Sequence, residues 1–131
     1  MNGKNSSGET LLEVEKIIRN TSDLELLRNR MKTYYDNSSI LTLIVRNPRC
    51  DEQLLKELSK HENDRVRYEV ALQAKKIKDE KILYKLAMDS RMEVRAALRI
   101  STVNEGIKKL IDRLNKNNKK YNAAMEKIQS I

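Results

Sequence analysis

A repeat of 28 residues constrains the fold of this chain more than any other feature of its sequence. Asp23, Asp51 and Asp79 each open one copy of the pattern. An apolar stripe follows each of these positions, and also residue 107, which is a fourth start in the same register. All eleven positions of the stripe are Leu or Ile, although the chain is only 39% hydrophobic. They are Leu26, Leu54, Ile82 and Leu110, then Leu27, Leu55, Leu83 and Ile111, then Leu58, Leu86 and Leu114. A fixed period of this length is typical of stacked supersecondary units, none of which can bury its apolar face alone.

The composition favours helices joined by short connections. With three Gly and one Pro in 131 residues, the chain has few residues for a turn-rich β fold, and its apolar spacing follows the helical period. The core must be aliphatic, because Trp and Phe are absent. We therefore expect an all-α protein, and the length is that of one domain with a continuous core.

The N-terminal part contains a tail, a capping helix and the first repeats. Residues 1–8 are polar and aperiodic, so we expect a disordered tail ahead of a single helical-repeat domain, 9–131. A capping box of Thr10 and Glu13 predicts a first helix over 9–20. Three two-helix repeats then follow, over 23–50, 51–78 and 79–106.

Towards the C-terminus the pattern changes. A second capping box, Ser90 to Glu93, is expected to start the second helix of the third repeat. Beyond it, apolar residues recur every seven positions and predict one long amphipathic helix, 107–130. Either this helix caps the last repeat, the interpretation we favour, or part of its stripe stays exposed to pair with a partner or a second copy.

Two stretches of the chain resemble a known family of helical repeats. Asn47-Pro48, Leu54-Leu55, Leu58, Val66-Arg67 and Val70-Ala71 match one unit, and Leu83, Leu86-Ala87, Asp89, Val94-Arg95 and Leu98 match the next. Together they resemble the HEAT-like family, most closely its variant leucine-rich repeat branch. The resemblance implies a short right-handed α-solenoid of about four two-helix repeats with N- and C-terminal capping helices.

The resemblance also implies an internal ladder of charged residues. In HEAT-like units an Asp in the loop between the two helices commonly pairs with the Arg of the Val-Arg dipeptide, and Asp89 and Arg95 have that spacing. The preceding unit has His61 in the place of the Asp, with Asp64 as a candidate substitute for pairing with Arg67.

No group of residues predicts catalysis. His61 is the only histidine, and a lone loop histidine is expected to be a solvated or capping side chain. Cys50 is the only cysteine, which excludes internal disulfides and multi-cysteine metal motifs and favours a structural thiol. The three repeat-opening aspartates are expected to be helix N-caps. We therefore expect no enzyme, no cofactor and no metal.

The absence of a secretory segment and of a long apolar run predicts a soluble, cytoplasmic protein without a membrane partner.

The charge of the chain points to an acidic partner, because the net charge is +8 and the pI is near 9.6. The alternative is a well-solvated surface, since charged residues of both signs are interleaved. A repeat array aligns equivalent positions, so basic residues near the helices and junctions would form a ribbon. We expect the partner-binding residues to be Arg91, Arg99, Lys75, Lys76, Lys78, Lys81, Arg49 and Lys108.

These observations predict a non-catalytic interaction module, an adaptor or inhibitor, that binds an acidic protein or nucleoprotein complex. We favour a protein partner, because nucleic-acid motifs and aromatic stacking platforms are absent from the sequence. The alternative function is direct, sequence-independent binding to the backbone of duplex DNA or RNA. The sequence contains nothing that specifies the oligomeric state.

Overall fold

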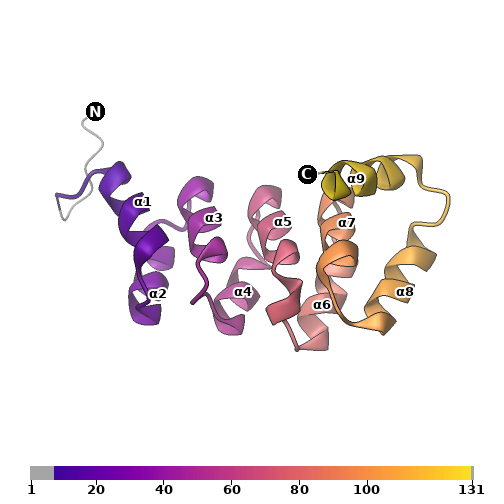
Figure 1. The fold of residues 1–131 in the computed structure, drawn as a ribbon, viewed down its shortest axis with the longest axis horizontal. Coiled ribbons are helices and arrows are strands. Elements are labelled where there is room, and N and C mark those ends of the chain that lie inside the picture. Colours follow the sequence, from indigo (N-terminus) through magenta and orange to yellow (C-terminus); the bar gives the residue numbers. More distant parts are fainter. Residues whose placement is uncertain (1–7, 131) are drawn as a thin grey trace. The chain divides into compact units, whose positions relative to one another are not determined.

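The computed structural model describes residues 8–130, and this part of the chain is all-helical, with 71% helix and no strand. The helices fall into two compact units, residues 8–51 and 52–130 (Figure 1). The first unit contains α1 (Leu11–Asn20), α2 (Leu24–Thr33) and α3 (Ser38–Arg46). The second contains α4 (Glu52–Leu58), α5 (Asp64–Leu72), a 3₁₀ turn η1 (Ala74–Lys76), α6 (Glu80–Ala87), α7 (Met92–Ser101), α8 (Glu105–Leu114) and α9 (Lys119–Gln129).

Side-chain caps fix most helix starts. The capping box at α1 is confirmed, because Thr10 Oγ1 accepts from the Glu13 amide and the Glu13 carboxylate accepts from the Thr10 amide. Asp23 and Asp79 cap α2 and α6, as predicted. Asp51 precedes α4 directly, and its Oδ2 also accepts from the Arg28 guanidinium at 2.7 Å.

The capping box expected at Ser90 is wrong. The N-cap of α7 is Arg91, whose side chain makes no cap hydrogen bond. The loop is held instead by Asp89, whose Oδ1 accepts from the Arg91 amide at 2.9 Å. Asp89 lies one residue before Ser90, and its short carboxylate makes the local side-chain-to-backbone turn that competes with a hydroxyl cap.

In the first unit α3 packs against α1 and α2 around an aliphatic core. A buried amide, Asn47, ties the end of α3 to the end of α1: its Nδ2 donates to the carbonyls of Ile18 and Thr21, at 2.7 and 3.0 Å. Its Oδ1 accepts from the Arg49 amide at 2.7 Å. The Asn47-Pro48 pair therefore ends the helix and also joins two helices.

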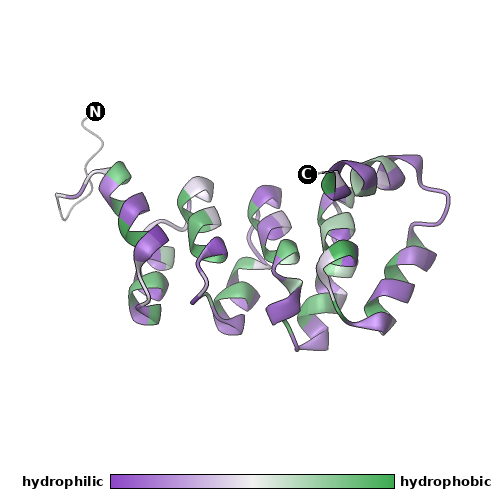
Figure 2. Cartoon of the chain, viewed as in Figure 1, coloured by the Kyte–Doolittle hydropathy of each residue, from purple (hydrophilic) through white to green (hydrophobic). Residues whose placement is uncertain are grey.

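In the second unit α7 is the central helix. It packs against α5 on one side and α9 on the other, and α6 packs against both α7 and α8. Green and purple residues mix along each helix in Figure 2, as expected where one face is buried and the other is in water. The core of this unit is aliphatic, as expected from the absence of Trp and Phe.

The 28-residue register describes burial well but fails at the last position. Eight of the eleven stripe residues are buried, and Leu26 and Leu110 are half-buried. Leu114, in register with the fully buried Leu58 and Leu86, is 49% exposed. α8 and α9 form the last helix pair among residues 8–130: α9 packs against α7, as α7 packs against α5, and no helix after α9 covers Leu114 in this part of the chain.

The single C-terminal helix expected over 107–130 is wrong, because the segment forms two helices, α8 and α9. Asn117 has a φ of 65°, a left-handed conformation that asparagine adopts more readily than most residues and that ends a helix. Asn118 then caps α9 by accepting from the Tyr121 amide at 3.0 Å. Two successive asparagines thus break a pattern that its apolar spacing alone would continue.

The predicted disordered tail, residues 1–8, lies outside the described residues except for Gly8. Between residues 8 and 130, none of the helices combines the length and the apolar character that crossing a membrane requires.

Candidate macromolecular interface

The eight basic residues expected to bind a partner separate into distinct groups. Arg49 lies exposed in the first unit, and the other seven lie in the second. Among these seven, Arg91, Lys108 and Arg99 have carboxylate partners. Arg91 Nε lies 3.0 Å from Asp64 Oδ2 and 3.5 Å from Glu93 Oε2, and Lys108 Nζ lies 3.1 Å from Glu105 Oε1. Each of these two cations therefore has a carboxylate beside it within the chain.

Arg99 is the third paired residue and links two helices. Its Nε and NH2 donate to the two carboxylate oxygens of Asp112, at 2.8 and 3.2 Å, which joins α7 to α8. The hydrogen bond to Asp112 raises the pKa of Arg99 above its ordinary value. Arg91 and Arg99, both in the predicted contact set, therefore form ion pairs within the chain.

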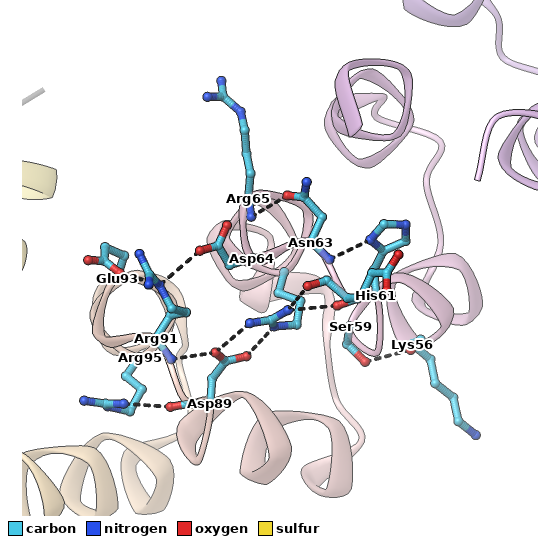
Figure 3. A network of polar contacts seen from close by, with 12 residues as sticks. Lys56, Ser59, His61, Asn63, Asp64, Arg65, Asp89, Arg91, Glu93 and Arg95 are labelled. Carbon is cyan, nitrogen blue, oxygen red and sulfur yellow. Dashed lines mark hydrogen bonds and ion pairs between the residues drawn. The ribbon is translucent and has the colours of Figure 1, made fainter. Parts of the chain in front are cut away.

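A network around Asp89 replaces the ladder implied by the resemblance (Figure 3). The Asp89 carboxylate accepts from Arg67, with 2.7 Å to Nε and 3.2 Å to NH2, and so reaches back to the preceding helix pair. The expected carboxylate pairing of Asp89 with Arg95 is wrong. Arg95 NH1 instead donates to the backbone carbonyl of Asp89 at 2.7 Å, and its Nε donates to Asn115 Oδ1 at 2.9 Å.

Arg67 and Arg95 nevertheless have equivalent roles, 28 residues apart. Each donates its NH1 to a carbonyl six residues before it, His61 or Asp89, and each uses its Nε to bind a side chain from the following helix pair. The hydrogen bond with Asp89 raises the pKa of Arg67. Both arginines therefore connect successive helix pairs, whereas Asp64, the candidate substitute, pairs with Arg91.

His61 is a buried residue of this network, so the solvated interpretation is wrong, and the side chain that caps α5 is that of Asn63. Its Nδ1 accepts from the Asn63 amide at 3.0 Å, as the Asp89 carboxylate accepts from the Arg91 amide two residues on. This bond requires the proton of a neutral imidazole to be on Nε2. Cys50 is also buried, with its Sγ 4.0 Å from the Asp51 carbonyl.

The remaining lysines of the predicted set lie near the junction between α5 and α6. Lys75, Lys78 and Lys81 are exposed, and Lys76 is half-buried. Over residues 8–130, no carboxylate lies within 4.0 Å of the ammonium groups of Lys75, Lys78, Lys81 or the neighbouring Lys85. Lys85, which sequence reasoning missed, therefore belongs with this group.

A basic surface emerges when the 28-residue register is applied to the outward faces of α4, α6 and α8. Twelve positions, four at or just beyond each of these helices, are equivalent, and all twelve are exposed. We call them the outward stripe: Gln53, Lys56, Glu57 and Lys60; Lys81, Tyr84, Lys85 and Met88; Lys109, Asp112, Arg113 and Lys116. Seven are basic and two are acidic, and one of the acidic pair, Asp112, is bound to Arg99. The stripe therefore concentrates positive charge on one set of helices.

Two residues of the outward stripe are large and apolar. Tyr84 is 54% exposed and Met88 is 51% exposed, both on the face of α6 that carries Lys81 and Lys85. The second unit also contains a cleft of about 420 Å³, lined by residues of α4 and around the start of α6, including Lys56, Lys78 and Ile82. One wall is fixed, because the Glu52 carboxylate accepts from the amides of Lys78 and Asp79, at 2.9 and 2.7 Å.

Residues 8–130 contain no cluster of three or more His, Cys, Asp or Glu side chains placed to hold a metal ion. Comparisons of the chain with protein-family models, with curated proteins and with solved structures found no match.

Proposed function

We propose that this chain is a right-handed α-solenoid of HEAT-like repeats that acts as a non-catalytic interaction module, an adaptor or inhibitor, for an acidic macromolecular partner. The solenoid is supported by the equivalent burial of Leu54 and Ile82, of Leu55 and Leu83, and of Leu58 and Leu86. It is also supported by the equivalent bonds of Arg67 and Arg95 to the helix pair that follows each of them.

The observation that carries the proposed function is the outward stripe. Its seven basic residues occur at repeat-equivalent, exposed positions, where a periodic array presents one sign of charge along a surface. Such a surface attracts acidic partners and speeds their association, with a strong dependence on salt. The predicted residue Lys81 belongs to the stripe, and Lys75 and Lys78 lie close to it in the chain.

We favour a protein partner over a nucleic acid. The stripe contains a single aromatic residue, Tyr84, whereas binding to single-stranded nucleic acid typically uses several aromatic platforms on which successive bases stack. Tyr and Met, in contrast, are enriched at protein–protein interfaces. The regular spacing of cations would also suit a phosphate backbone, so duplex binding is the alternative that the experiment must separate.

Two triple variants of equal charge change test the proposal. The first variant alters the outward stripe by changing Lys81, Lys85 and Lys109 to Glu. The second is a matched control that alters the exposed surface of α9 by changing Lys119, Lys120 and Lys127 to Glu. We expect the stripe variant to lose salt-dependent binding to poly-glutamate in a fluorescence titration, and the α9 variant to keep it. Equal binding by both variants would refute the stripe as the contact surface.

A second titration, with a 20-base-pair DNA duplex, separates the two partner classes. If the partner is a protein, the chain should bind the DNA duplex no more tightly than proteins that bind DNA non-specifically, which have a Kd of about 10⁻⁴–10⁻⁶ M at physiological salt. Sub-micromolar binding would favour the nucleic-acid alternative, provided that the slope of log K against log salt is about −0.9 for each of several phosphates.

A further inference from the structure

One face of α6 combines two cations with two large apolar side chains. Lys81, Tyr84, Lys85 and Met88 follow an i, i+3, i+4, i+7 spacing, which places them on one side of the helix. The opposite side faces the core through four buried residues, Ile82, Leu83, Leu86 and Ala87. α6 therefore has an apolar core face and, separately, two half-exposed apolar residues directed to solvent.

The repeat provides an internal comparison that separates packing from function. The positions equivalent to Tyr84 are Lys56 and Asp112, and those equivalent to Met88 are Lys60 and Lys116. All four equivalents are charged and exposed, so the fold does not need an apolar residue at either position. Since exposed apolar residues next to each other favour association, Tyr84 and Met88 point to a role in contacting a partner.

We infer, building on the proposed function, that Tyr84 and Met88 are the anchor for an acidic protein segment that carries an apolar or aromatic side chain. The surroundings complement such a segment in charge: Lys81 and Lys85 flank the anchor on α6, and the position of α4 equivalent to Tyr84 is the exposed Lys56. An apolar centre with a charged rim is the usual anatomy of a protein-binding surface, and truncation of central Tyr residues often costs most of the affinity.

Two other occupants fit the charges less well. A second copy of this chain has a net charge of +8 and would place one basic stripe near another, which like-charge repulsion opposes. The N-terminal residues 1–7 contain Lys4 and no acidic residue, so they do not complement the stripe either.

The test compares two acidic polymers that differ in apolar content. Poly-glutamate supplies charge alone, and a random copolymer of glutamate and tyrosine of matched length supplies charge with aromatic side chains. We expect the chain to bind the copolymer about tenfold more tightly, the difference that one good anchor residue can provide. The preference should persist at about 0.5 M salt, where screening suppresses the ionic contribution to both polymers.

Three variants connect this preference to α6. Tyr84→Ser with Met88→Ser should abolish the preference for the copolymer and leave binding to poly-glutamate unchanged. Lys81→Gln with Lys85→Gln should weaken binding to both polymers. Val103→Ser, which removes an exposed apolar residue outside the stripe, is the matched control and should change neither. All the replaced side chains are exposed, so the Tm should shift by no more than about 2 °C.

The outcomes distinguish the inference from the proposed function. If the chain binds both polymers equally, or if the preference survives in the Tyr84→Ser, Met88→Ser variant, the anchor is refuted while the basic surface stands. Preferential binding of a 20-base-pair DNA duplex over the copolymer would also overturn the anchor. If neither polymer binds in a salt-dependent way, the proposed function fails and the anchor fails with it.

Discussion

Removal of the Asp89 carboxylate should destabilise the second unit more than the loss of any exposed ion pair. The side chain is 8% exposed and accepts three hydrogen bonds, two from Arg67 and one from the Arg91 amide. Breaking a buried pair by removing one partner costs about 3–5 kcal/mol. Arg67 keeps its bonds to the carbonyls of His61 and Glu62, which lowers the cost. We therefore expect Asp89→Ala to reduce the free energy of unfolding by about 3 kcal/mol.

The chain contains a matched control with nearly the same geometry. Asp112 accepts from Arg99 at 2.8 and 3.2 Å, as Asp89 accepts from Arg67 at 2.7 and 3.2 Å. The side chain of Asp112, however, is 54% exposed, and solvent screens the pair. Asp112→Ala should therefore cost no more than about 1 kcal/mol.

Urea unfolding followed by circular dichroism measures both variants, and Asp89→Asn adds a third point. The substituted amide keeps one neutral oxygen acceptor but loses the negative charge, so its cost should fall between the two alanine values, at about 1–2 kcal/mol. If Asp89→Ala and Asp112→Ala destabilise the protein equally, burial does not set the strength of these pairs and our reasoning is wrong.

Three further predictions concern single side chains. Leu83→Ala should cost about 2–5 kcal/mol in urea melts, whereas Leu114→Ala, at an equally apolar but half-exposed stripe position, should cost under about 1 kcal/mol; similar losses would contradict the difference in burial between the two side chains. Burial raises the pKa of Tyr121, so the contribution of its neutral hydroxyl to stability is present below the ordinary value of 10.0 and is lost as the pH rises beyond it. Tyr121→Phe should therefore reduce the fall in unfolding free energy above that pH. The same variant should not destabilise the protein near neutral pH, because the buried hydroxyl has no hydrogen-bond partner among residues 8–130. His61→Ala should cost about 1–2 kcal/mol, since it removes the buried acceptor of the Asn63 amide, and should leave polymer binding unchanged; full stability would show that this acceptor is unimportant.

The candidate site was only partly visible in the sequence. Charge and period predicted a basic surface that includes the exposed Lys81, but the ion-pair partners of Arg91 and Arg99 were not apparent. Arg99 and Asp112 are 13 residues apart, and nothing local marks them as a pair. Tyr84 lies in α6 next to the buried Leu83, and only its orientation away from the core reveals it as a surface residue.

The sequence by itself determined the helices before residue 107 and the 28-residue register of their buried residues. Apolar spacing and caps such as Asp23 and Asp79 act within one turn of helix, so they are encoded by neighbouring residues and can be read directly. Tertiary structure alone decided that the Asp89 carboxylate binds Arg67 rather than Arg95, and that Leu114 is exposed. These outcomes depend on which helices pack against one another. Residues some 20 positions apart come into contact only through packing, which a local pattern does not record.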